Sequence, residues 1–199
     1  MFGFFKKKKV DDESNVINVY SPIDGFVVSQ KKIPDEGFSE GYMGLGVGLR
    51  PRTFQTGEEK KLEVVAPLGG KLEVVFKTGH AYIIRENKHN LAVMLHLGIN
   101  TVEISQDKGA FVTELKQGQD INELEPLCTM NLDVIHEIMK TEREKPASPE
   151  EDMEGKKTSD VSALLVQSEN LEGKTVVPVK KDGEPVSKGE VILKIIPEK

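Results

Sequence analysis

The stretch that decides the fold is KLEVVAPLGGKLEVVFKTGHAYIIRENKHNLAVMLHL, residues 61–97. Its short apolar runs are rich in Val, Ile and Leu and are separated by Gly, Pro and Asn, the pattern of strands joined by tight turns. Similar runs stand before it, within residues 16–29, and after it, within residues 162–196. Helical spacing is clear only in NLDVIHEIMK, residues 131–140. We therefore expect an all-β domain, an antiparallel β-sandwich or barrel-like fold with one or two short helices.

Two pairs of segments resemble each other within the chain. SPIDGFVV (residues 21–28) matches APLGGKLEVV (66–75), because each places a small residue, Pro, an apolar residue and a later Gly before a strand. KQGQDINELEPL (116–127) matches KDGEPVSKGEVI (181–192), because each begins with Lys-x-Gly. Repeated units of this kind predict an internal duplication of the β architecture.

A single domain from residue 16 to residue 198 accounts for the strand-like segments. Within it, residues 141–160 (TEREKPASPEEDMEGKKTSD) are charged and contain two prolines and almost no apolar side chains. We expect a disordered insertion there, because such a segment cannot bury enough apolar surface to fold. Residues 1–15 form an N-terminal tail whose start, MFGFFKKKK, suits contact with an anionic membrane surface as well as a frayed end.

The composition narrows the class of protein and its compartment. The net charge of −6 argues against a nucleic-acid-binding protein, which needs a concentrated basic face. The single cysteine, Cys128, excludes an internal disulfide and suits a reducing compartment. The tail places its aromatic residues before its lysines, the reverse of a secretion signal, and no apolar run approaches the ~20 residues that span a bilayer. We expect a cytoplasmic protein.

Two histidines lie near the open end of a predicted hairpin. Residues 76–84 and 91–102 flank RENKHN (residues 85–90), a polar turn. If the hairpin pivots near Lys88, His80 lies opposite His96 and Tyr82 lies opposite Met94, and directly opposed side chains share one face. Thr78 lies on that face too, by the strand period of two. A register slip of one residue would put the partners on opposite faces.

Two adjacent imidazoles suit phosphoryl transfer. An imidazole is largely neutral at pH 7, so one ring nitrogen has a lone pair that can attack phosphorus. A second imidazole and the Thr78 hydroxyl can then hydrogen-bond the phosphoryl oxygens or orient the first ring. Two other readings remain open at this point, a single structural histidine and a zinc site. Zinc is less well supported, because the chain has no HExxH, HxH or CxxC motif. His89 and His136 are expected to lie outside the site.

These residues resemble the glucose-type enzyme IIA family of the phosphoenolpyruvate-dependent sugar phosphotransferase system. The family signature around the active histidine is similar to HLGINTV at residues 96–102, and the segment of its second histidine is similar to TGHA at 78–81. The family's opening motif appears as SPIDG at 21–25, and its Pro-Asp-x-x-Phe segment as PDEGF at 34–38. The resemblance covers residues 18–140 and 163–197.

The resemblance implies a fold, an activity and a set of partners. The fold would be the family's antiparallel β-sandwich, and the activity that of a phosphotransferase component. His96 would accept a phosphoryl group from the phosphocarrier HPr and pass it to a cysteine of an EIIB domain, while His80 and Thr78 steady the phosphohistidine. No cofactor would be required, although zinc bridged by His80, His96 and a partner carboxylate is a further expectation. By position, the residues that would dock partners are Asp35, Phe38, Phe76, Met94, Val102 and Glu103.

The chain departs from the family pattern at the site's edge. Asn100 stands where the family has an aspartate, which removes one charge from the docking surface, and Asn90 stands where it has a glycine. Two other functions remain alternatives to phosphoryl transfer. One is a regulatory module that uses the same patch to dock permeases or kinases, and the other is a zinc-dependent hydrolase on a similar duplicated β fold.

Overall fold

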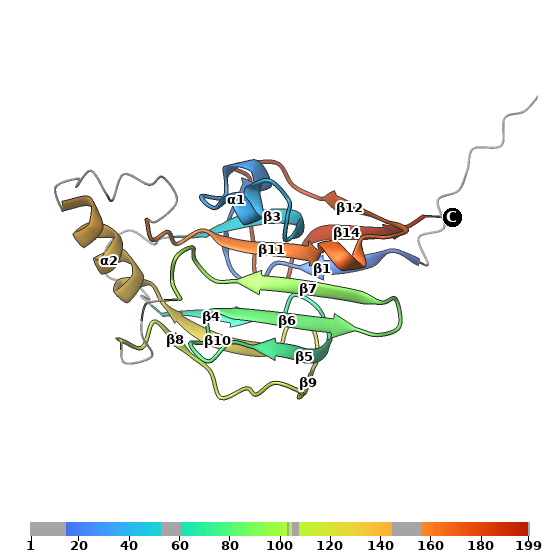
Figure 1. Ribbon diagram of the computed structural model, residues 1–199, viewed down its shortest axis with the longest axis horizontal. Helices are drawn as coiled ribbons and strands as arrows, with labels where there is room; N and C mark the ends of the chain where they lie inside the picture. The colour runs from blue at the N-terminus through green and yellow to red at the C-terminus, as the bar shows by residue number, and fades with distance from the viewer. Residues whose placement is uncertain (1–14, 53–60, 103, 105–107, 145–156, 199) are drawn as a thin grey trace, which may run out of the picture.

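The computed structural model describes residues 15–52, 61–102, 104, 108–144 and 157–198, and its regular secondary structure consists mainly of antiparallel strands (Figure 1). The first half contains β1 (Ile17–Tyr20), β2 (Gly25–Ser29), α1 (Glu36–Ser39), β3 (Gly44–Pro51), β4 (Lys61–Val65), β5 (Gly70–Val75), β6 (Ala81–Glu86) and β7 (Leu91–His96). The second half contains β8 (Phe111–Val112), β9 (Asp120–Ile121), β10 (Pro126–Asn131), α2 (Leu132–Glu144), β11 (Ser162–Gln167), β12 (Lys174–Pro178), β13 (Pro185–Val186) and β14 (Val191–Pro197). Single 3₁₀ turns at Gln30–Lys32 (η2) and Ser168–Asn170 (η4) follow β2 and β11. The all-β prediction is confirmed.

The strands form one large sheet and two small ones. The large sheet has the order β13-β2-β3-β11-β7-β6-β5-β9, and the small sheets have the orders β1-β14-β12 and β4-β10-β8. Figure 1 shows α2 at one end of the molecule and the turn between β6 and β7 at the other. The carboxyl end of β7 therefore lies on the side of the molecule nearer α2.

The predicted duplication appears as matched hydrogen bonds at the two edges of the large sheet. At one edge the Gly183 N–H donates to the Val27 carbonyl at 2.8 Å, and at the other the Gly118 N–H donates to the Leu72 carbonyl at 2.7 Å. The turns before β2 and β5 repeat this likeness, because both Ser21 N–H and Ala66 N–H donate to a glutamate carbonyl at 2.8 Å. The repeated segments are therefore structurally equivalent.

Two apolar clusters lie on opposite faces of β6 and β7. Tyr82 and Leu95 point into the main core, whereas Ile83 and Met94 point to a smaller cluster. This alternation is the period of two that a strand imposes on its side chains. The smaller cluster consists of Ile33, Phe38, Met94, Ile99, Ala163 and Leu165, with Ile83 packed against it. One member of this cluster, Phe38, packs against the ring of His96.

The register of the β6–β7 hairpin differs by one residue from the prediction. His96 pairs with Ala81 rather than with His80, and Tyr82 pairs with Leu95 rather than with Met94. The cause is the turn, which has four residues, 87–90, and so pivots between Lys88 and His89. The Glu86 carboxylate accepts the N–H groups of Lys88 and His89 at 2.8 and 2.9 Å and fixes this turn.

The ends of the predicted insertion belong to the fold. Helix α2 continues through residues 141–144, and the Glu142 carboxylate accepts the N–H and the hydroxyl of Thr158 at 2.8 and 2.7 Å. Residues 145–156 lie outside the described residues, as do residues 1–14 of the expected tail. Within the described ranges, neither helix has the length and apolar character needed to cross a membrane.

Candidate active site

His96 stands at the carboxyl end of β7, between two neighbouring strands. It pairs with Ala81 of β6 on one side and with Ala163 of β11 on the other. Its Nδ1 lies 2.7 Å from the carbonyl oxygen of Gly98. A carbonyl can only accept, so Nδ1 carries the proton and the lone pair is left on Nε2. The half-buried ring lies 5.1 Å from the Phe38 ring, centroid to centroid.

His80 lies just before β6 and is 3% exposed. Its Nδ1 is hydrogen-bonded to the hydroxyl of Thr78, two residues earlier. The rings of Phe76 and Phe111 lie 5.2 and 6.5 Å from its ring. Phe111 was not among the predicted site residues, because it comes from β8, far away in the sequence, and no motif links it to the histidines.

The two imidazole rings meet even though the predicted direct pairing is wrong. Their centroids are 4.9 Å apart and their planes cross at 77°. His80 lies outside the strand, after Gly79 at φ +73°, so the alternation of faces that governs β6 does not fix its side chain. Its carbonyl accepts the Leu97 N–H at 2.7 Å, so its backbone lies opposite Leu97, one residue past the Ala81–His96 pair. The two histidine rings are therefore neighbours, as expected, although the register from which this was inferred is wrong.

Burial keeps both imidazoles neutral. Burial, followed by the charge of His96, lowers the pKa of His80 to about 4. Burial also lowers the pKa of His96, and this effect is opposed by the Gly98 carbonyl and by the charge of Asp35. At pH 7 each ring therefore has an unprotonated nitrogen, and His96 has it at Nε2.

Some of the predicted docking residues are buried in the smaller apolar cluster, and others lie on the surface. Phe38 and Met94 are each 7% exposed and belong to the smaller cluster, so Met94 lies beneath the site rather than on its rim. Phe76 and Val102 are exposed. Glu103 lies outside the described residues. The remaining residue, Asp35, caps α1, and its carboxylate accepts the Phe38 N–H at 3.1 Å.

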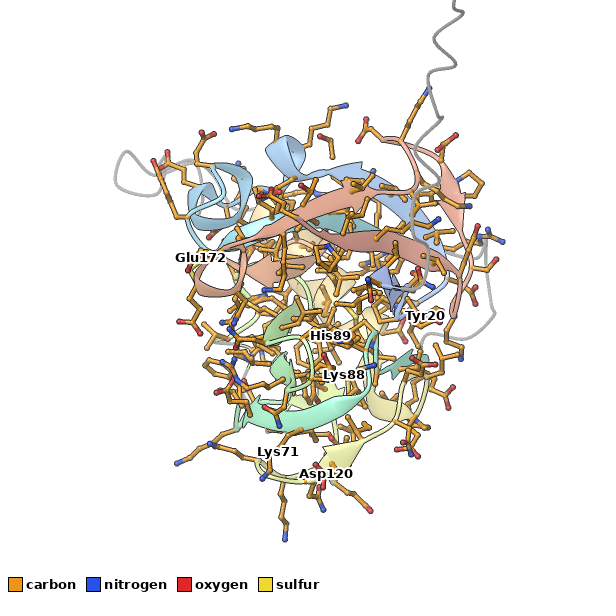
Figure 2. The ribbon with its side chains drawn as sticks, turned by 90° about the vertical axis from the view of Figure 1, so that its right-hand side faces the viewer. Tyr20, Lys71, Lys88, His89, Asp120 and Glu172 are labelled. Carbon is orange, nitrogen blue, oxygen red and sulfur yellow. The ribbon has the colours of Figure 1, made fainter. Side chains whose placement is uncertain are left out.

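The other two histidines have partners elsewhere. His89 Nδ1 lies 2.8 Å from the Glu86 carboxylate in the β6–β7 turn, and His136 Nε2 of α2 lies 3.1 Å from that of Asp160. Figure 2 looks onto the end of the molecule where His89 and Lys88 lie. Strand β7 separates that turn from His96 by roughly 17–20 Å. Among the residues that the structure describes, no three His, Cys, Asp or Glu side chains gather to hold a metal.

Known proteins share both this sequence and this fold. The family model of the phosphoenolpyruvate-dependent sugar phosphotransferase system, EIIA 1, matches residues 17–143. The glucose-specific EIIA component of Staphylococcus epidermidis is 33% identical over 138 residues, which are 69% of this chain and 75% of that protein. The glucose-specific EIICBA component of Staphylococcus carnosus is 40% identical over 119 residues, 60% of this chain but only 16% of that longer protein.

A solved structure extends the likeness beyond the matched residues. The glucose permease IIA from Mycoplasma capricolum has a TM-score of 0.65 and 25% identity, and the match covers 96% of this chain and 99% of that one. It therefore includes β11 to β14, which follow the segment that the family model matches. By sequence and by fold, this chain belongs to the EIIA 1 family of the phosphoenolpyruvate-dependent sugar phosphotransferase system.

Proposed function

We propose that the chain is a histidine phosphocarrier in which His96 accepts a phosphoryl group from phosphorylated HPr and passes it to a cysteine of an EIIB domain. The observation that carries this proposal is the contact of two neutral imidazoles, 4.9 Å apart, each with its Nδ1 already hydrogen-bonded. In each ring, Nε2 is therefore the nitrogen that remains to act on a phosphoryl group. The fused C, B and A components of the Staphylococcus carnosus relative support EIIB as the acceptor.

Acceptance of the phosphoryl group begins at His96 Nε2. The lone pair on this atom attacks phosphorus while the bond to the donor breaks and its electron pair leaves with the donor. The product ring carries positive charge, because Nδ1 keeps its proton. The Gly98 carbonyl at 2.7 Å and the charge of Asp35 both favour a positive ring, and they therefore stabilise the phosphorylated state. Onward transfer reverses the step, with an EIIB thiolate as nucleophile and the His96 nitrogen as leaving group.

His80 supplies a neutral hydrogen-bond donor. When the Thr78 hydroxyl donates to His80 Nδ1, the ring proton is held on Nε2, from which it can donate to a phosphoryl oxygen. Because the pKa of His80 is about 4, the ring donates as a neutral group at pH 7. It can steady the phosphoryl group without placing a second positive charge beside the charged His96.

Partner docking would use the exposed surface around the pair. Phe76, whose ring lies 5.2 Å from that of His80, offers apolar contact area beside the pair, and Val102 is a second exposed apolar side chain in the loop after β7. Asp35 adds a negative charge that suits a basic partner. A docking role of Glu103 and membrane contact by the N-terminal tail remain predictions, because Glu103 and residues 1–14 lie outside the described residues. The proposal needs no cofactor and places the chain in the cytoplasm with its donor.

The test is phosphorylation of the full chain by HPr, which is itself phosphorylated from phosphoenolpyruvate by the phosphotransferase of the system, followed by intact-mass measurement and mapping. We expect one acid-labile phosphoryl group on His96 and none on His96→Ala. His80→Gln should accept the group but transfer it onward slowly. His89→Gln is the matched control, because it changes a histidine at the far end of the same hairpin. Labelling of His96→Ala would contradict the proposal, and loss of labelling only in His80→Gln would reverse the two roles.

The alternative regulatory role has its own test. A regulatory docking module would keep both partner binding and its effect on the partner after His96→Ala, whereas a phosphocarrier with this substitution would still bind but would no longer transfer the phosphoryl group. Zinc bridged by the two histidines would need further ligands from that partner, since two imidazoles fill only half of a tetrahedral site.

A further inference from the structure

The loop that follows His96 is held by the start of β11. The Gly98 N–H donates to the hydroxyl of Ser162 at 3.2 Å, and both residues are buried. Ile99 and Ser159 exchange two backbone hydrogen bonds, of 2.9 and 3.0 Å. The Thr101 hydroxyl closes the loop by donating to the Leu97 carbonyl at 2.8 Å.

We propose that Ser162 is a positioning residue for phosphoryl transfer, which acts on His96 through Gly98. This inference rests on the proposed function of His96. The Gly98 carbonyl is the group that holds the proton on His96 Nδ1, so its direction decides which ring nitrogen is free to react. Ser162 fixes the peptide unit before the Gly98 Cα, and Ser159 fixes the unit after it, which contains that carbonyl.

Because residue 98 is a glycine, Ser159 can approach it closely, but its backbone also needs hydrogen bonds to hold it in one conformation. Gly98 has φ +68°, and a Cβ there would lie 2.8 Å from the Ser159 carbonyl oxygen. The close approach of Ser159 therefore requires a residue without a side chain. A glycine, however, has no side chain to restrict its backbone, and it populates many conformations unless its neighbours hold it. The Ser162 hydroxyl accepts the Gly98 N–H, and this side-chain bond can be removed by mutation.

The position of Ser162 shows what the C-terminal segment adds to the site. Residues 159–162 follow the part that the family model matches, residues 17–143. In β11, Ser162 precedes Ala163, the residue that pairs with His96. Strand β11 therefore supports His96 in two ways. Ala163 pairs with His96 itself, and Ser162 binds the loop that follows His96.

The experiment compares Ser162→Ala with Ser162→Cys, which keeps the size of the side chain but has only a weak acceptor. Ser21→Ala is the matched control, because Ser21 is also fully buried and its hydroxyl donates to a backbone carbonyl, that of Ile23, at 2.8 Å. The first readout is the tautomer of His96 in the unphosphorylated full chain, from its ring ¹⁵N shifts. The second is the single-turnover rate of phosphoryl acceptance from phosphorylated HPr.

We expect His96 to be the Nδ1–H tautomer in the wild type and a mixture in both Ser162 variants. Acceptance should slow by roughly threefold to tenfold in both, the ratio that loss of one neutral hydrogen bond corresponds to. Ser21→Ala should match the wild type in tautomer and rate. An unchanged tautomer in both Ser162 variants overturns the inference, whatever their stability. If the wild type accepts no phosphoryl group, the proposed function fails, whereas the tautomer comparison still decides the role of Ser162.

Discussion

Acidification should destabilise the wild-type protein more than His80→Gln. An imidazole of the unfolded chain takes up a proton near pH 6.5, whereas burial and the charge of His96 hold the pKa of His80 at about 4 in the folded protein. Between these two values the unfolded state binds more protons, so the folded state loses stability as the pH falls. The full interval corresponds to about 3.4 kcal/mol as an upper bound. Partly exposed neighbours such as Phe76 admit water that screens the effect, and we expect about 2 kcal/mol.

Urea denaturation at several pH values between 7.5 and 4.5 measures this difference. The free energy of unfolding of the wild type should fall below pH 6.5, and the decline should be shallower in His80→Gln by about 2 kcal/mol over the whole range. Val102→Ala is the control, because it changes an exposed side chain and removes no titrating group. Its curve should run parallel to that of the wild type. Parallel curves for the wild type and His80→Gln would refute the argument that His80 is kept neutral by its surroundings.

Three other substitutions test single contacts. Gly98→Ala should lower the free energy of unfolding by about 2–4 kcal/mol in urea denaturation, because it adds a Cβ 2.8 Å from the Ser159 carbonyl oxygen at a positive φ. Thr78→Val should slow transfer to EIIB by about tenfold in a single-turnover assay, because the second imidazole loses its hydroxyl partner, and should leave the site of labelling unchanged. Asp35→Asn should lower the pKa of His96 further in an NMR titration, since the negative charge that favours the imidazolium is removed, while the asparagine still caps α1.

The sequence pattern located the strands and helix α2 well, but it did not locate helix α1. The run of residues 91–96 is strand β7 throughout, and the helix expected over residues 131–140 is α2, which extends to Glu144. The four-residue helix α1 has no periodic pattern of its own, because a single turn is too short to show one. Its start is marked only by Asp35, whose side chain accepts the Phe38 N–H. Such a capping contact can be recognised in a sequence once the presence of a helix is suspected.

The register of the hairpin could not be read from the pattern, because symmetry of the apolar residues leaves the pivot uncertain by one position. What decides it is the Glu86 carboxylate, which accepts two turn N–H groups and closes a four-residue turn. The same pattern also could not separate Met94, two residues before His96 in the strand, from an exposed rim residue. Both positions face the same side of β7, and only the packing of Phe38 and Ala163 shows that Met94 is covered.

The histidine pair depends less on the sheet than the hairpin prediction assumed. A strictly alternating ladder in the observed register would send His80 and His96 to opposite faces. They meet because the chain leaves the strand at Gly79, where φ is +73°, and because Thr78 then fixes the direction of the His80 ring. In the loop after β7, Gly98 at φ +68° directs its carbonyl back to His96. Each of the two imidazole rings is thus oriented by a glycine beside it and by one hydrogen bond at Nδ1. The precise geometry of the site therefore resides in two short loops, while the strands supply the distance between them.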